Sequence, residues 1–141
     1  MKSATTVSQL LQTKGHDVWS VTPETSVYSA LKLMADKNVG ALPVFKSDQL
    51  VGMFSERDYA RKVILQGKSS RYLPVRVIMT SIVASVIPEH SIEDCMELMT
   101  DKRVRHLPVF EDDRVIGVIS IGDVVKSLIS EQELPKPQLK S

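Results

Sequence analysis

Two sets of residues in this sequence have the types and the spacing needed to hold a small polar ligand. An aspartate three residues after a serine, at the start of a helix, projects from the same side of the first turn as that serine. Such an aspartate can accept hydrogen bonds from the two vicinal hydroxyls of a ribose, and the backbone amides of the helix start can bind phosphate. The pattern Gly-x-x-Ser-x-x-Asp, which indicates this chemistry, occurs twice, as Gly52, Ser55 and Asp58 and as Gly117, Ser120 and Asp123.

The same residues also have purely structural explanations. Ser55 and Ser120 suit the N-cap of a helix, and Asp58 and Asp123 could simply complement the positive end of a helix dipole. The N-cap role is compatible with ligand binding. The occurrence of the whole pattern in two places favours a ligand site, but both interpretations stay open at this point.

The two patterns belong to an internal repeat. Residues 18–64 align without a gap with residues 83–129, a shift of 65 positions, and 20 of the 47 aligned residues are identical. Average composition would give about three identities by chance. A duplicated structural unit is therefore expected, and each copy must place its serine and aspartate by the same elements.

Each copy predicts the element order β-α-β-β-α. A short apolar strand leads into a proline and a helix start, apolar residues at helical spacing follow, and two strands flank a polar turn before a closing helix. In the first copy the strands are 18–21, 42–45 and 50–54 and the closing helix begins near Ser55; in the second they are 83–86, 107–110 and 115–119, with a helix from near Ser120.

The predicted fold is therefore α/β in the α+β sense, with two β-α-β-β-α motifs packed with pseudo-twofold symmetry and an extra N-terminal helix. One copy by itself buries too little surface to be stably folded, so the two are expected to form a single module. The expected segments are an N-terminal helical extension (1–15), motif 1 (16–66), a linker (67–80), motif 2 (81–130) and a flexible tail (131–141).

Composition excludes several classes of protein. The 18 basic and 17 acidic side chains give a net charge of +1, without the basic field that drives nucleic-acid binding. No run approaches the 18 or so apolar residues of a membrane span, and no secretory signal is recognisable. The single cysteine excludes an intramolecular disulfide, and the three histidines lack metal-ligand spacing. A cytoplasmic protein without a metal site is expected.

The repeated motifs resemble the CBS (Bateman) domain family. The resemblance rests on an apolar-Pro-apolar-apolar strand followed by Gly-x-x-Ser-x-x-Asp, given twice and covering residues 18–129; the strands are Leu42-Pro43-Val44-Phe45 and Leu107-Pro108-Val109-Phe110. It implies a disc-shaped pair that often dimerises. It also implies adenosine-containing ligands, among them AMP, ADP, ATP, NAD and S-adenosylmethionine, in clefts between the copies.

The resemblance also implies which residues bind. Adenine would lie against strand residues, and the phosphates of a nucleotide held by Asp58 would point toward Arg105 and His106, so the Asp58 site is favoured. Arg57 is the nearest cation for the Asp123 site. The favoured site comprises Asp58, Ser55, Arg57, Gly40, Ala41, Leu42, Pro43, Thr22, Arg105 and His106, and the second site comprises Asp123, Ser120, Leu107, Pro108 and Ile87.

The expected function is that of a non-catalytic regulatory module that binds an adenine nucleotide (AMP, ADP, ATP or NAD(H)) and signals by a conformational or oligomeric change. Sequence motifs for a P-loop, a dinucleotide fold or a hydrolase elbow are lacking, so no catalytic cofactor is expected. A homodimer and an unidentified protein effector are the expected partners. The alternative is a structural or interaction protein that uses the pair for oligomerisation and binds no nucleotide.

Overall fold

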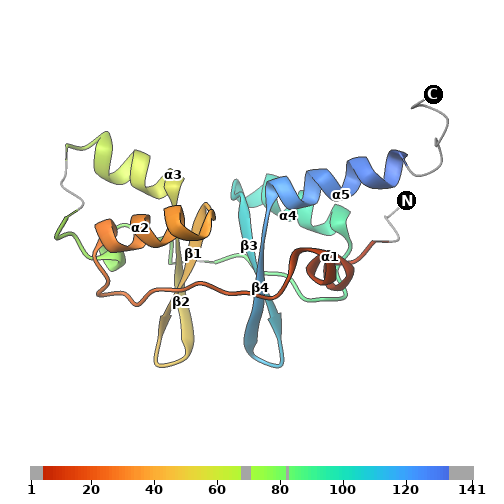
Figure 1. The fold of residues 1–141 in the computed structure, drawn as a ribbon, viewed down its shortest axis with the longest axis horizontal. Coiled ribbons are helices and arrows are strands. Elements are labelled where there is room, and N and C mark those ends of the chain that lie inside the picture. Colours follow the sequence, from red (N-terminus) through yellow and green to blue (C-terminus); the bar gives the residue numbers. More distant parts are fainter. Residues whose placement is uncertain (1–4, 68–70, 82, 134–141) are drawn as a thin grey trace. The chain divides into compact units, whose positions relative to one another are not determined.

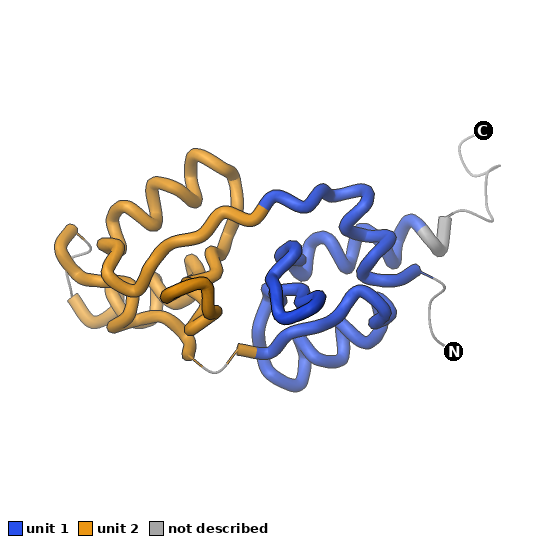
Figure 2. The backbone as a smooth tube through the Cα atoms, turned by 90° about the horizontal axis from the view of Figure 1, so that it is seen from below, with its two compact units in different colours: residues 1–17, 84–141 blue, residues 18–83 orange. Residues whose placement is uncertain are grey.

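The computed structural model describes residues 5–67, 71–81 and 83–133 (Figure 1). The chain forms two compact units (Figure 2). The first-copy unit consists of residues 18–83, and the second-copy unit joins residues 1–17 to residues 84–141. The N-terminal segment thus belongs with the second copy of the repeat. The segment boundaries expected from the sequence stay a prediction, as does the symmetric packing of the copies.

Each unit contains one two-stranded antiparallel sheet and the helices that pack with it. The first-copy unit holds α2 (Val27–Lys37), β1 (Ala41–Lys46), β2 (Gln49–Ser55), α3 (Glu56–Tyr59), a π-helical turn η1 (Ala60–Ile64) and a 3₁₀ turn η2 (Val75–Val77). The second-copy unit holds α1 (Val7–Lys14), α4 (Ile92–Lys102), β3 (His106–Glu111), β4 (Arg114–Ser120) and α5 (Ile121–Glu133). The predicted mixed fold with an N-terminal helix is confirmed.

The two hairpins are structural copies of each other. Ala41 pairs with Ser55 at the open end of one and His106 with Ser120 in the other, and each strand pair has a bulge after its central valine. The predicted polar turns are two-residue connections in which both residues have positive φ, the backbone of tight hairpin turns. This register places the serine of each motif at the end of its second strand.

The predicted first strand of each motif is wrong in extent. Only Val21 and Val86 pair there, each through an isolated parallel bridge to the central valine of the next strand. Pro43 and Pro108, next to those central valines, have no N–H to continue the ladder, and Pro23 or Pro88 follows two residues later. The first strand therefore shrinks to one bridging residue in each copy.

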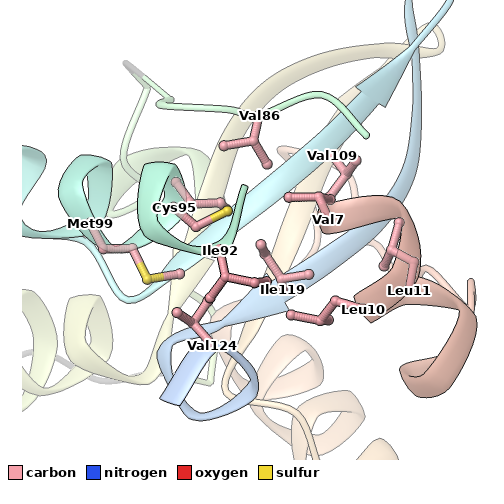
Figure 3. Packing of buried hydrophobic residues seen from close by; sticks show 11 residues of the cluster. Val7, Leu10, Leu11, Val86, Ile92, Cys95, Met99, Val109, Ile119 and Val124 are labelled. Atoms are coloured by element: carbon pink, nitrogen blue, oxygen red, sulfur yellow. The ribbon is translucent and has the colours of Figure 1, made fainter. Parts of the chain in front are cut away.

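The inner faces of the elements form one hydrophobic core in each unit. In the second-copy unit, Val7, Leu10 and Leu11 on α1 are buried together with side chains of β3, β4, α4 and α5 (Figure 3). Helix α1 begins with a capping box at Thr6 and ends at Gly15, whose φ of 107° suits glycine. The predicted N-terminal helix is therefore part of a core.

The closing helices differ from expectation in two respects. Ile64, Val125 and Ile129, which the periodicity places among the packing residues, are exposed, whereas Val63 and Val124 are fully buried. Helix α5 also runs to Glu133, so the first residues of the segment expected to be a flexible tail are helical. Residues 134–141 and residues 1–4 of the expected N-terminal extension lie outside the described residues.

Candidate functional site

The first candidate carboxylate, Asp58, lies where β2 passes into α3. Ser55 is the N-cap of this helix, and the two residues form a capping box: Asp58 N–H donates to Ser55 Oγ (3.1 Å) and Ser55 N–H donates to Asp58 Oδ2 (3.0 Å). Ser55 Oγ is also 3.0 Å from the same carboxylate oxygen. The capping role considered from the sequence is therefore present, and it fixes the carboxylate at the helix start.

The other oxygen of Asp58 is held by two side chains of the same unit. Thr80 Oγ1 donates to Asp58 Oδ1 at 3.2 Å, and Lys62 Nζ lies 3.2 Å from the same oxygen, one helical turn along. Thr80 is itself fixed, because its N–H and C=O both bond to the backbone of Met53 (2.8 and 2.9 Å). Asp58 is buried, with 9% of its surface exposed, and both of its oxygens have protein partners.

The second carboxylate, Asp123, is held at the start of α5 by its serine and by a distant lysine. Ser120 N–H donates to Asp123 Oδ2 (2.8 Å), and Asp123 N–H donates to Ser120 Oγ (3.1 Å). Lys14, in the last turn of α1, forms an ion pair with the same oxygen at 2.6 Å and also donates to the carbonyl of Val118. Across the described part of the chain, Asp123 Oδ1 accepts no hydrogen bond.

The charges around Asp123 alter two pKa values. Burial alone would raise the pKa of Asp123, but the bonds from Lys14 and Ser120 outweigh it and hold this pKa below its usual range. The pKa of His106 is lowered from 6.5 to about 4: burial is the largest cause, the positive charges of Lys14 and Arg105 act in the same direction, and Asp123 acts in the opposite one. His106 is therefore an uncharged imidazole at neutral pH.

The glycine of each motif makes room for a neighbouring segment. A Cβ at Gly52 would lie 2.7 Å from the Met79 sulfur and 2.9 Å from the Thr80 carbonyl oxygen, and one at Gly117 would lie 2.7 Å from a methyl of Leu11. Both glycines are buried. At both positions the group that approaches the glycine closely is a part of the protein itself.

The structure brings together part of each predicted residue set. Glu56 N–H donates to the Gly40 carbonyl (3.0 Å) and Ile121 N–H to the Arg105 carbonyl (2.8 Å), so the start of each hairpin lies against its helix start. The strand residues Ala41, Leu42, Pro43, Leu107 and Pro108 are buried, Ser55, Ser120, Gly40 and His106 are partly buried, and Thr22, Arg57, Ile87 and Arg105 are exposed. Arg105 and His106 belong to the second-copy unit, and their predicted role toward Asp58 stays a prediction.

Three residues that hold the carboxylates were absent from the sequence prediction. Lys62 has a recognisable signal, because an acid and a base four residues apart on a helix can pair. Thr80 and Lys14 have none, since they reach their aspartates from 22 and 109 residues away. Their positions follow from how the core covers each sheet.

Metal and membrane sites are not indicated in the described residues. In 5–67, 71–81 and 83–133, no group of three or more histidine, cysteine, aspartate or glutamate side chains could hold a metal ion. Within the same ranges, none of the helices combines the length and the apolarity that crossing a membrane requires.

Comparison with known proteins identifies the repeat. The family described as CBS domain matches residues 7–65 and 75–130. A solved protein with CBS domains from Burkholderia ambifaria is 50% identical, with a TM-score of 0.86 over 91% of this chain and 96% of that chain. A protein of Arabidopsis thaliana, named CBS domain-containing protein CBSX3, mitochondrial, is 44% identical in an alignment 138 residues long, which covers 91% of this chain and 66% of the relative.

A more distant solved structure carries ligands. The CBS domain pair of protein MJ0100 was solved in complex with 5′-methylthioadenosine and S-adenosyl-L-methionine. It is 22% identical to this chain, with a TM-score of 0.79 over 90% of this chain and 98% of that chain. At this identity the likeness concerns the fold alone.

Proposed function

Because the chain belongs to the CBS domain family and carries two such domains in tandem, we propose that it is a non-catalytic regulatory module whose ligand is an adenine nucleotide. The nucleotide would bind at the two helix starts that carry Ser55 with Asp58 and Ser120 with Asp123. AMP, ADP, ATP and NAD(H) are the candidates. Its position between the two copies, which the family resemblance implies, stays a prediction.

The proposal rests on one observation: each carboxylate is fixed by its own serine and completed by donors that a ligand can replace. At Asp58 the donor that a ligand can replace is the Thr80 hydroxyl, which shares one carboxylate oxygen with the Lys62 ammonium, and at Asp123 it is the Lys14 ammonium. A ribose presents two hydroxyl donors side by side, so it can take the place of these groups without leaving the carboxylate unsatisfied. Hydrogen bonds to a charged acceptor contribute about 1.5–3 kcal/mol each.

The choice of adenosine ligands has support from outside the chain. The distant CBS pair described above holds two molecules that share an adenosine group. In this chain, each helix start carries a carboxylate that can accept bonds from vicinal hydroxyls. This acceptor favours a nucleoside-type ligand, which brings hydroxyl donors, over a simple anion.

Of the three residues predicted to contact phosphate, two are cations and one, His106, is uncharged at neutral pH. Arg57 and Arg105 are exposed cations and remain the candidate charged partners. His106 is uncharged at neutral pH because its pKa is about 4, so it would act as a neutral hydrogen-bond donor in the first encounter. A bound phosphate would favour its protonation, because a nearby negative charge raises the pKa of a base.

Regulation requires that the ligand prefer one state of the module to another. A ligand shifts a conformational or oligomeric equilibrium only by its differential affinity for the two states. Release of Thr80 or Lys14 from a carboxylate would change the contacts of the segment that covers each sheet. We propose these covering segments as the parts that respond to binding.

Thermal unfolding against a nucleotide panel tests the proposal. AMP, ADP, ATP, NAD, NADH and S-adenosylmethionine are each added at about 100 times a trial dissociation constant, where a ligand stabilises by about 2.7 kcal/mol and raises the melting temperature by several degrees. Asp58→Asn and Asp123→Asn keep an acceptor for the cap and remove the charge. A shift lost in Asp58→Asn supports the favoured site, and loss only in Asp123→Asn moves the assignment to the second site.

Matched controls are available because the repeat supplies them. Asp36 and Asp101 occupy equivalent exposed positions on α2 and α4, so Asp36→Asn and Asp101→Asn make the same charge change away from the helix starts. Both should keep the full thermal shift. Absence of any shift with the whole panel would contradict nucleotide binding.

One observation favours the alternative, assembly through the pair. The apolar side chains of Val125 and Ile129 are exposed one helical turn apart on α5 of the second-copy unit, and exposed apolar side chains on one helix are the kind of surface that pairs with a second copy. Sedimentation velocity of the wild type and of Ile129→Lys tests this. A dimer in the wild type that Ile129→Lys disrupts, together with no nucleotide shift, would establish assembly as the function.

A further inference from the structure

The cation on Asp123 comes from an element whose position is fixed by packing. Lys14 Nζ lies 2.6 Å from Asp123 Oδ2 and 2.5 Å from the Val118 carbonyl oxygen. The lysine side chain is 35% exposed and that of the aspartate 24%. Since Leu10 and Leu11 anchor α1 in the core of the second-copy unit, the lysine stem begins from a fixed point and only its side chain is free to turn away.

We propose that Lys14 is a specificity-determining residue of the Asp123 position, which makes this position select ligands with an anionic group over uncharged nucleosides. The inference rests on the proposed function and goes beyond it, because it assigns the choice of ligand charge to a residue outside the repeated motif.

The first step of the argument is competition for the carboxylate. Oδ2 of Asp123 accepts from Ser120 N–H and from Lys14, while Oδ1 accepts no bond among the described residues. A first ribose hydroxyl can use Oδ1 freely. A second hydroxyl must donate to Oδ2, where the ammonium now lies, so a two-hydroxyl contact displaces Lys14.

The second step is the fate of the displaced charge. Lys14 and Arg105 both act on His106 as positive charges and Asp123 as a negative one, so these groups carry a net charge of +1 while the imidazole is neutral. A displaced ammonium loses its anionic partner, while the positive charge of Arg105 continues to act on the same imidazole. A ligand phosphate gives the flexible lysine a new counterion, whereas adenosine has no group that can replace Asp123.

The Asp58 position lacks this requirement. Its hydroxyl donor, Thr80, is uncharged, and its ammonium, Lys62, lies on the same helical segment four residues along. A ligand hydroxyl can exchange with Thr80 while Lys62 stays in place, so no charge is released. The selectivity for anionic ligands should therefore be specific to Asp123.

Site-resolved titration tests the inference on the full chain. Amide ¹⁵N–¹H spectra are followed with ADP and with adenosine, reading dissociation constants at Ser120 and Asp123 for this position and at Ser55 and Asp58 for the other. The variant Lys14→Gln removes the ammonium. Lys102→Gln, at an exposed position in the last turn of α4, makes the same charge change elsewhere in the unit and is the control.

Lys14→Gln should lower the preference for ADP over adenosine at the Asp123 position by about fivefold, equivalent to about 1 kcal/mol, mainly because adenosine binds more tightly. Lys102→Gln should keep the wild-type preference, and the preference at Asp58 should not change in either variant. A wild-type preference retained in Lys14→Gln, or ligand shifts only at Ser55 and Asp58, would overturn the inference and leave the proposed function standing. Absence of shifts at both positions would instead overturn the proposed function itself.

Discussion

The two copies of the repeat share their hairpin, turn and helix start, but they are covered by different parts of the chain. In the first copy the segment that follows it returns to the sheet: Met79 and Thr80 lie over Gly52, and Thr80 reaches Asp58. In the second copy α1, which precedes both copies, takes this place: Leu11 lies over Gly117, and Lys14 reaches Asp123. Figure 3 shows the packing of α1 in the second case.

A duplicated motif therefore does not by itself give two sites with the same hydrogen-bond donors. The repeated serines fix the carboxylates, while the covering segment adds a hydroxyl at Asp58 and an ammonium at Asp123. Most of the differences between the sites therefore lie outside the aligned residues; Lys62, which is replaced by Ser127 in the second copy, is a difference within them. Substitutions in the covering segments, α1 and the segment with Met79 and Thr80, should therefore affect the two copies more differently than substitutions in the repeated motifs.

The largest expected effect concerns Leu11, the fully buried cover of the second copy. Leu11→Ala should lower the free energy of unfolding by about 3 kcal/mol, since truncation of a buried leucine leaves a cavity. Met79→Ala, in the partly buried cover of the first copy, should cost about 1 kcal/mol. Urea unfolding followed by circular dichroism measures both. Equal losses in the free energy of unfolding would show that the two covering segments contribute equally to stability.

The next largest effect is a difference in stability between alanine substitutions at the two motif glycines. Gly52→Ala should lower the free energy of unfolding by about 2 kcal/mol, because its methyl would press on the carbonyl oxygen of Thr80, whose backbone N–H and C=O are both hydrogen-bonded to Met53. Gly117→Ala should cost about 1 kcal/mol, because the end of the Leu11 side chain can turn aside. The same unfolding measurement applies, and a larger loss in Gly117→Ala would reverse the argument.

A comparable effect depends on pH and is confined to the second copy. The folded pKa of His106, about 4, is below the ordinary value of 6.5, so the unfolded chain takes up the proton first. Stability from the neutral imidazole is complete above pH 6.5 and is lost as pH falls from 6.5 toward 4. The wild type should therefore lose about 2 kcal/mol more than His106→Gln between pH 7 and pH 4. Parallel pH profiles of the two proteins would contradict this assignment.

The smallest effect compares the two lysines. Lys14→Gln and Lys62→Gln should each lower the free energy of unfolding by less than about 1 kcal/mol, since both ion pairs are partly exposed. The loss in Lys14→Gln should shrink at high salt, because screening already weakens the pair it removes. Denaturant titrations at 0.05 and 1 M sodium chloride measure this. A salt-independent loss would indicate a packing role for the Lys14 stem.

Much of the fold could be predicted because each sequence pattern occurs in both copies, so one copy supports the interpretation of the other. The strands at 42–45 and 50–54, the polar turn between them and the helix start at Ser55 follow from patterns that occur twice, and each is found in the structure. Local chemistry is sufficient there: alternation, turn residues and a capping serine act within a few residues of one another.

The sequence could not predict the parts that depend on distant packing. The first strands shrink to Val21 and Val86 because prolines in the neighbouring strands interrupt the ladder. Ile64 and Ile129 have the right spacing for an inner face and yet are exposed, since periodicity does not say which side a neighbour will cover. Lys14 lacks any local signal for its aspartate, because their contact joins the two ends of a discontinuous unit.

That discontinuity bears on how the protein is made. Helix α1 leaves the ribosome before Ile119 and Val124, the β4 and α5 side chains with which it shares a core, exist. At 5–20 residues per second, the chain between Leu11 and Ile119 takes roughly 5–20 s to synthesise. During that interval the whole first copy is synthesised, while the apolar side chains of α1 have no β4 or α5 side chains to pack against.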